Sequence, residues 1–161
     1  MKNPIVYSED YEFEFSKGIL LRKGTDISII AAGTMVHESL VAAEILGKIG
    51  ISASVIDMHT IKPLDTAIIN DVCLRSKLIV TVEEHSVIGG LGGAIAECLS
   101  EIGNIPRQVK IGIPDAFQRV GDYQYLLKEN NLTGPQIADR IKEEYCNDGK
   151  NVHEMNVSDI V

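Results

Sequence analysis

Short apolar runs alternate along the chain with segments whose apolar residues recur at helical spacing. Four apolar runs predict strands at residues 27–32, 54–58, 77–82 and 109–113. The segments between and after them predict helices at 36–49, 66–76, 94–102, 125–128 and 137–145. Strands separated by helices of this length indicate βαβ units, and therefore a mostly parallel sheet with helices on both faces.

Polar residues mark where several of these helices open. Asp65 and Asp122 occupy N-cap positions, and Thr133 and Gln136 have the spacing of a capping box. A further short run at 19–22 precedes the first βαβ unit and has charged flanks, which suit an edge strand. The pattern therefore predicts a fifth strand at one side of the sheet.

The chain of 161 residues has the length of one domain, and neither a repeat nor a linker divides it. We assign residues 1–146 to this domain and expect a disordered tail at 147–161, where periodicity is lost. Three separated cysteines without a C-x-x-C pair favour a reducing cytoplasm. The N-terminus does not have the pattern of a signal peptide, and no apolar stretch is long enough to span a bilayer.

The formal net charge of −8 argues against nucleic acid and anionic membranes as partners, because an acidic surface repels phosphates. A binding site is instead expected at the carboxyl ends of the strands, where open α/β sheets bind ligands. Loops 32–34, 59–65 and 83–93 lie at this edge. The third loop, EEHSVIGGLGG, places carboxylates, a histidine and four glycines before a predicted helix.

Glycines at this place permit positive φ and close approach of the backbone, and amides at a helix N-terminus can hold an anion. The candidate anion- or partner-binding loop comprises Glu84, His85, Gly89, Gly90, Gly92 and Gly93. Tight packing of the helix over a strand is the competing interpretation. Because side chains alternate along a strand, Glu83, Glu84 and His85 cannot all point into one site. We expect them to be structural anchors or interface contacts rather than catalytic groups.

Other signatures of catalysis or cofactor binding are missing from the sequence. The glycines do not form a dinucleotide fingerprint, since Ile95 stands where its last glycine belongs, and no P-loop or G-x-S-x-G elbow occurs. His37 falls in the first turn of a helix, where an exposed structural role is expected. No spacing of His, Cys and carboxylates predicts a metal site. We therefore assign no catalytic, cofactor-binding or metal-ligating residue to this chain.

Four segments carry a family resemblance: GTDISIIAAGTMV, VIDMHTIKPLD, TVEEHSVIGGLGGAIAE and IGIPDAF. Their order and spacing resemble the C-terminal domain of transketolase, over residues 11–145. Related segments occur in the beta subunits of 2-oxo-acid dehydrogenases and in deoxyxylulose-phosphate synthase. His85 directly after the glutamate pair, followed by GGLG, favours the transketolase branch.

The resemblance implies a three-layer α/β/α fold with a five-stranded, mostly parallel sheet and one antiparallel edge strand, which residues 19–22 fit. In the family, thiamine diphosphate and Mg²⁺ lie between two other domains, and the complete enzyme transfers a two-carbon ketol unit between sugar phosphates. The resemblance therefore implies that this chain binds no cofactor alone and is inactive alone. Its partners would be the cofactor-binding domains or subunit and further copies of itself, in the cytoplasm.

Two alternatives remain open at this stage. The chain could be the corresponding domain of a 2-oxo-acid dehydrogenase beta subunit, or a stand-alone, non-catalytic interaction module. In either case, apolar surface that meets a neighbouring domain in the family is expected to be exposed, near the first residues through Phe15.

Overall fold

The computed structural model describes residues 4–7, 11 and 13–151, and five strands and five helices lie within them. The strands are β1 (Ile19–Arg22), β2 (Ile27–Ala31), β3 (Ala53–Asp57), β4 (Leu78–Ser86) and β5 (Arg107–Ile113). The helices are α1 (Met35–Lys48), α2 (Thr66–Arg75), α3 (Leu91–Ser100), α4 (Tyr123–Glu129) and α5 (Gly134–Asn151).

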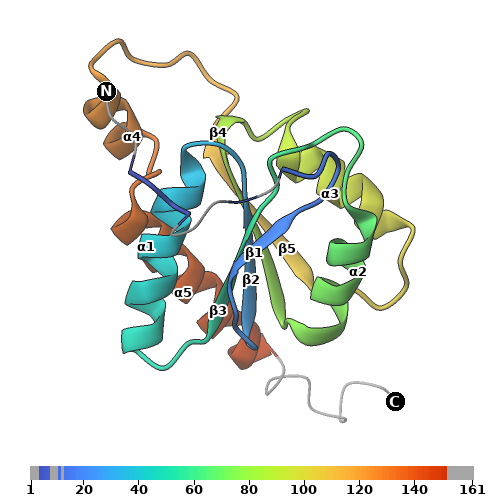
Figure 1. Ribbon diagram of the computed structural model, residues 1–161. Coiled ribbons are helices and arrows are strands. Elements are labelled where there is room, and N and C mark those ends of the chain that lie inside the picture. The colour runs from blue at the N-terminus through green and yellow to red at the C-terminus, as the bar shows by residue number, and fades with distance from the viewer. Residues whose placement is uncertain (1–3, 8–10, 12, 152–161) are drawn as a thin grey trace, which may run out of the picture.

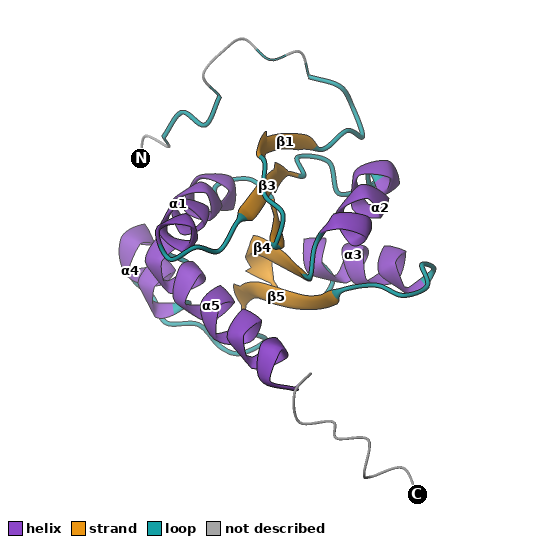
Figure 2. Ribbon diagram, turned by 90° about the horizontal axis from the view of Figure 1, so that it is seen from below, coloured by secondary structure: helices purple, strands orange, loops and turns teal. Residues whose placement is uncertain are grey.

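The strands form one sheet in the order β1-β3-β2-β4-β5. Strand β1 pairs antiparallel with β3, and the other three pairings are parallel. Helices α1, α4 and α5 cover one face of the sheet, and α2 and α3 cover the other (Figures 1 and 2). The expected three-layer α/β/α fold with an antiparallel edge strand is confirmed.

Two apolar clusters hold the layers together. One lies between the sheet and α1 and α5, where Leu46 and Ile141 pack under the strands. The other lies between the sheet and α2 and α3, around Ile95. The neighbouring residues Ile29 and Ile30 of β2 belong to opposite clusters. This strand is therefore buried on both faces, which explains its continuous apolar run.

The helix caps read from the sequence are present. The Asp65 carboxylate accepts a hydrogen bond from the Ile68 amide at 3.2 Å, and Asp122 accepts one from the Tyr125 amide at 2.9 Å. The Gln136 side chain reaches back to the amide of Thr133 at 3.4 Å, which is one half of a capping box. These contacts are local, and for that reason the sequence reveals them.

Several predicted boundaries are wrong, three of them at places that matter for the candidate loop or the tail. Strand β4 continues to Ser86, because Ser86 pairs with Ile113 of β5 and holds the polar residues in extended backbone. Helix α3 begins at Leu91 rather than at 94, so two glycines of the candidate loop lie in its first turn. Helix α5 continues to Asn151 rather than ending at 145, since extending an existing helix costs little without a proline.

The expected disordered tail at 147–161 is therefore helical as far as 151, and its remainder lies outside the described residues. Across the described part of the chain, every helix is too short or too polar to cross a bilayer.

Candidate functional site

The chain changes its direction of winding at the carboxyl end of β2. The connection through α1 leads to β3 on one side of β2, and the connection through α2 returns past it to β4 on the other side. Loops after β2 and β4 therefore diverge onto opposite faces, which leaves room at this edge. The turn at Gly33, whose φ is +60°, and the end of β4 border this switch point.

The Glu83 side chain caps the N-terminus of α3. Its carboxylate accepts hydrogen bonds from the amides of Leu91, at 2.7 Å, and Gly92, at 2.8 Å. The side chain is buried, with 3% of the residue exposed. The amide partners and the positive end of the helix dipole stabilise the buried charge. An external anion would have to displace this carboxylate, so binding of an anion by the loop stays a prediction.

The glycines of the candidate loop differ in what surrounds them. A Cβ atom at Gly90 would lie 1.9 Å from Glu83 Oε2, and one at Gly92 would lie 2.9 Å from Thr81 Oγ1. Gly89 has a φ of +79°, whereas a Cβ at Gly93 would meet nothing within 4 Å. Two of the four glycines thus allow the helix to approach β4 closely, as the packing interpretation requires.

A shallow groove runs over the outer side of this loop. It has a volume of about 480 Å³. Its lining includes Ile61, Lys62, Gly89, Gly90 and Gly93. The groove joins the loops that follow β3 and β4, so a segment of a partner has space to enter between them.

His85 lies beside the glycines, whereas Glu84 does not: a Cβ atom at Gly90 would lie 2.8 Å from His85 Nδ1. His85 is exposed, and its Nδ1 donates a hydrogen bond to the carbonyl oxygen of Ser86 at 3.0 Å. Glu84 points to the opposite face of the sheet, where it accepts hydrogen bonds from the hydroxyls of Thr34 and, at 2.7 Å, Tyr123. The prediction that the three residues after Val82 alternate between faces is therefore confirmed.

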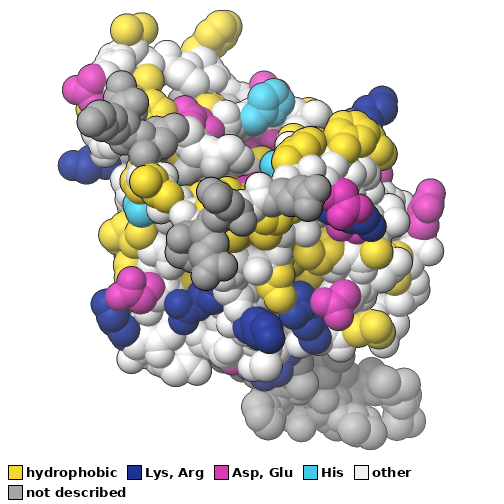
Figure 3. Space-filling model, viewed as in Figure 1, with side chains coloured by type: hydrophobic (Ala, Val, Ile, Leu, Met, Phe, Trp, Pro, Cys, Tyr) yellow, Lys and Arg dark blue, Asp and Glu magenta, His cyan; other side chains and the backbone are white. Residues whose placement is uncertain are grey.

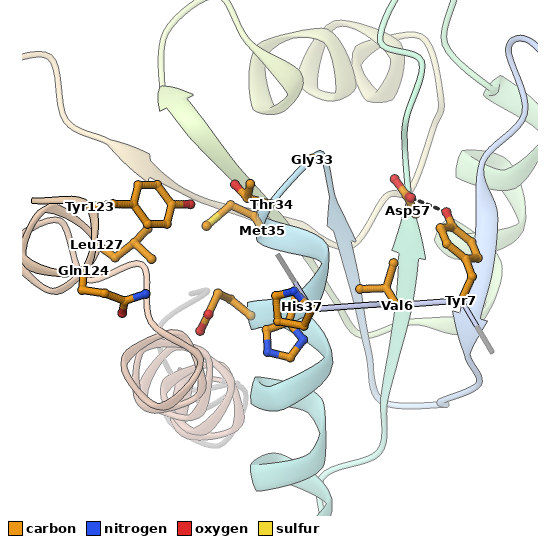
Figure 4. A pocket seen from close by; sticks show the side chains of 12 residues that line it. Val6, Tyr7, Gly33, Thr34, Met35, His37, Asp57, Tyr123, Gln124 and Leu127 are labelled. Atoms are coloured by element: carbon orange, nitrogen blue, oxygen red, sulfur yellow. Dashed lines mark hydrogen bonds between the residues drawn. The ribbon is translucent and has the colours of Figure 1, made fainter. Parts of the chain in front are cut away.

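A second hollow lies on the Glu84 side, between the start of α1, the end of β3, α4 and the N-terminal segment, with a volume of about 490 Å³. Figure 4 shows Tyr123 at one side, Thr34 and His37 at the centre, and Tyr7 with Asp57 at the other side. Burial, together with the nearby Glu84 carboxylate, raises the pKa of Tyr123. Its lining combines carboxylates, and hydroxyls that already donate to carboxylates, with apolar side chains such as Val6 and Leu127.

Asp57 is a residue of this hollow that the sequence did not single out. It ends β3, is only 7% exposed, and accepts a hydrogen bond from the hydroxyl of Tyr7. Burial and this contact raise the pKa of Tyr7. Among the described residues its second carboxylate oxygen has no hydrogen-bond partner. The one available signal was its place as a charged residue next to the end of the predicted strand at 54–58.

His37 and His59 also lie at this edge. His37 is in the first turn of α1, as predicted, and lines the hollow. The His59 Nδ1 lies 2.9 Å from Thr60 Oγ1, and the Phe13 ring covers the imidazole at a centroid distance of 4.7 Å. The described residues contain no group of three or more His, Cys, Asp or Glu side chains that could hold a metal ion.

The fold and these loops define an open α/β domain with a reversal of winding and two hollows at its carboxyl edge. The family model described as "Transketolase, C-terminal domain" matches residues 16–137. The chain belongs to this family, as its sequence motifs indicated.

Curated relatives agree with this family. A protein of Methanocaldococcus jannaschii named as a transketolase C-terminal section is 48% identical over 143 residues, which cover 87% of this chain and 44% of that protein. A 6-deoxy-6-sulfo-D-fructose transketolase subunit of Clostridium sp. is 44% identical and covers 81% of this chain and 40% of its own length. A 1-deoxy-D-xylulose-5-phosphate synthase of Chlorobium phaeovibrioides is 42% identical, over 82% of this chain and 21% of that enzyme.

Solved structures share the fold. The inactive β4 tetramer of a split-gene transketolase superposes with a TM-score of 0.81 at 40% identity, over 87% of this chain and 46% of that chain. The transketolase of Campylobacter jejuni superposes with a TM-score of 0.57 at 19% identity, over 80% of this chain and 18% of that chain. The chain therefore spans less than half the length of each relative named here.

Proposed function

We propose that this chain serves as the C-terminal part of a thiamine-diphosphate-dependent transketolase, without catalytic residues of its own. The proposal rests on how much of this chain, and how little of its relatives, the similarity covers. The family match takes up most of this chain, whereas the chain accounts for 44% of the M. jannaschii relative and 46% of the split-gene structure. The chemistry would then reside in the polypeptide that supplies the remaining length.

The described residues of this chain do not fit thiamine diphosphate and its Mg²⁺ ion. A diphosphate–metal site needs carboxylate or carbonyl ligands that converge on the ion, and the described residues offer no such acidic or histidine cluster. The amides at the start of α3, which could hold a diphosphate, are occupied by Glu83. We therefore propose that the cofactor and its metal ion bind on partner domains.

We further propose that the complete enzyme transfers a two-carbon ketol unit between sugar phosphates in the cytoplasm and assembles as an oligomer. The names of the Clostridium relative and of the split-gene structure support a subunit of a larger assembly. The deoxyxylulose-phosphate synthase relative supports a second product class for the same domain. The 2-oxo-acid dehydrogenase alternative rests on the sequence motifs alone.

Reconstitution tests this proposal. The segment of the split-gene β chain that this chain matches is replaced by residues 1–161, and the chimera is mixed with the other subunit of that enzyme, thiamine diphosphate and Mg²⁺. Ketol transfer between sugar phosphates is expected from the mixture, and none is expected from residues 1–161 alone. Formation of 1-deoxy-D-xylulose 5-phosphate instead would assign the other branch.

Two results would contradict the proposal. One is cofactor-dependent turnover by the isolated chain. The other is a chimera that folds and binds the second subunit but remains inactive with both product assays, which would favour a non-catalytic interaction module. The unaltered split-gene enzyme serves as the positive control.

A further inference from the structure

The buried carboxylate of Asp57 uses only one of its two oxygens in contacts with the described residues. The residue is 7% exposed. One oxygen accepts a hydrogen bond from the Tyr7 hydroxyl, whereas the other is covered from solvent and accepts none from any described residue. Buried polar atoms are nearly always hydrogen bonded, because an unpaired one costs free energy. This second oxygen, which points away from Tyr7, therefore needs a donor that the described residues do not supply.

Asp57 lies in the wall of the hollow at the start of α1, whose volume is about 490 Å³. A hollow of this size can enclose a small molecule. Its charged lining is acidic: Glu38 shares the wall with Asp57, and the described lining residues include neither lysine nor arginine. His37 is the one described lining side chain that can carry a positive charge. The side chains of Val6 and Leu127 add apolar surface for the carbon atoms of a ligand.

The acidic groups around the hollow have neutral partners. Glu38 accepts a hydrogen bond from the Gly134 amide, and Glu84, beside the hollow, accepts one from the Tyr123 hydroxyl at 2.7 Å. Figure 3 shows Lys and Arg side chains gathered over the lower part of this face, near the amino ends of the strands, whereas the hollow lies at their carboxyl ends, which are uppermost in Figure 1. The carboxylates at this edge therefore attract positive charge to the hollow.

The contacts of Asp57 narrow the class of cation. A metal ion needs several converging ligands, and the described residues contain no group of three or more His, Cys, Asp or Glu that could hold one. A guanidinium binds a carboxylate best through both oxygens, and Tyr7 already occupies one of them. An ammonium group is a compact charge that donates separate hydrogen bonds, so a single available oxygen suits it.

We propose that this hollow binds a small primary ammonium compound, whose ammonium group donates a hydrogen bond to the second oxygen of Asp57. The carbon chain of the ligand lies against Val6 and Leu127. Because the oxygen is covered from solvent, residues 4–7 have to shift to admit the ligand; they belong to no helix or strand. This inference goes beyond the proposed function and does not depend on it.

A titration of the isolated chain with n-butylammonium chloride at constant ionic strength, followed by amide chemical shifts, tests the proposal. Saturable shifts are expected at Gly33, Thr34 and Asp57. The n-butyltrimethylammonium ion has the same charge but no N–H donor, and it is expected to bind at least about tenfold more weakly. The n-butylguanidinium ion is expected to bind at least about threefold more weakly, because it finds one oxygen instead of two.

Two variants of equal charge separate this site from a general attraction of cations. Asp57→Asn keeps the size of the side chain and an acceptor for Tyr7, and its affinity for n-butylammonium is expected to fall at least about tenfold. Glu97→Gln removes one charge from an exposed position on α3, across the sheet, and is expected to leave the affinity unchanged. Melting temperatures of both variants show whether the domain stays folded.

Tyr7→Phe gives a readout that does not depend on the folding of Asp57→Asn. This variant frees the oxygen that Tyr7 occupies, so n-butylguanidinium is expected to gain at least about threefold in affinity relative to n-butylammonium. An unchanged ratio of the two affinities would contradict the assigned contact.

Three further outcomes would overturn the proposal. Shifts that grow linearly with concentration, or that are equal for n-butylammonium and n-butyltrimethylammonium, would show only a general attraction of cations to an acidic surface. An affinity that is the same in a folded Asp57→Asn variant would exclude Asp57 as the acceptor. A preference of the unchanged chain for n-butylguanidinium would assign the hollow to a different class of ligand.

Discussion

Glu83 and Glu84 are neighbours in the sequence, and the structure uses them in opposite ways. Glu83 faces α3, is buried, and accepts hydrogen bonds from two backbone amides. Glu84 faces α1 and α4, is exposed, and accepts hydrogen bonds from two hydroxyls. The same chemical group therefore anchors a helix on one face of the sheet and borders an open hollow on the other.

The difference between these two residues shows which part of the carboxyl edge is structural. A buried charge with fixed amide partners contributes to stability and is costly to displace, whereas exposed side-chain pairs contribute little. We therefore interpret the α3 side of the candidate loop as scaffold. The surface left there for a partner, under the proposed function, is the groove beside the glycines.

Replacing Glu83 by Ala is expected to have the largest effect on stability. The Leu91 and Gly92 amides would lose a charged acceptor in a buried place, and the free energy of unfolding is expected to fall by about 3 kcal/mol. Urea denaturation followed by circular dichroism measures this. A loss equal to that of the matched variant Glu84→Ala would refute the distinction between the two faces.

Gly90→Ala tests the same anchor from the helix side. The new Cβ would overlap the Glu83 carboxylate, and the free energy of unfolding is expected to fall by about 2 kcal/mol. Gly93→Ala is the control, because its Cβ would enter open space within the first turn of α3. Alanine favours a helix over glycine there, so stability is expected to rise by up to about 1 kcal/mol. Equal losses in both variants would contradict the packing interpretation.

Asp26 extends the comparison to the opposite edge of the sheet. Its hydrogen bond with the Lys77 ammonium, at 2.9 Å, is the main cause that lowers the pKa of this carboxyl. A lowered pKa in the folded state means that the stabilisation is complete above the ordinary Asp pKa and is lost as pH falls through the lowered value. Asp26→Asn is expected to lower the free energy of unfolding by about 1 kcal/mol at neutral pH and to leave it unchanged in strong acid. Denaturation curves at both pH values check this, and a cost that persists in acid would exclude the ionic origin.

Glu84→Gln is expected to have the smallest effect. Because the side chain is exposed, the free energy of unfolding is expected to fall by less than about 1 kcal/mol. The informative readout is Tyr123. Burial and Glu84 both raise the pKa of Tyr123, so removing the charge is expected to lower this pKa toward its ordinary value without restoring it fully. Phenolate absorbance during a pH titration measures the shift, with Tyr123→Phe identifying the signal. An unchanged titration would show that Glu84 does not act on Tyr123.

The sequence predicts the layers of this fold well, because hydrophobic periodicity and caps such as Asp65 are local properties. It misses the end of β4, because the extended backbone at Ser86 depends on pairing with Ile113, which lies 27 positions further along the sequence in β5. It also misses Glu83 as the partner of α3, and the contact between Tyr7 and Asp57, because both require the folded arrangement.

The exposed surface was predicted only in part. Exposure of Phe15 agrees with the expectation from the family resemblance, whereas no sequence pattern predicts the exposure of Phe117. A single phenylalanine after a strand is normally assigned to the core, and only the structure shows that its loop projects away from the sheet.

The central claim is that this chain satisfies its own helix N-terminus and leaves the cofactor to a partner. Amide chemical shifts of the isolated chain during a titration with thiamine diphosphate and Mg²⁺ test it most directly. We predict no saturable change at Leu91, Gly92 or elsewhere. Saturable shifts of the Leu91 and Gly92 amides would show that the cofactor displaces Glu83 and would contradict the account.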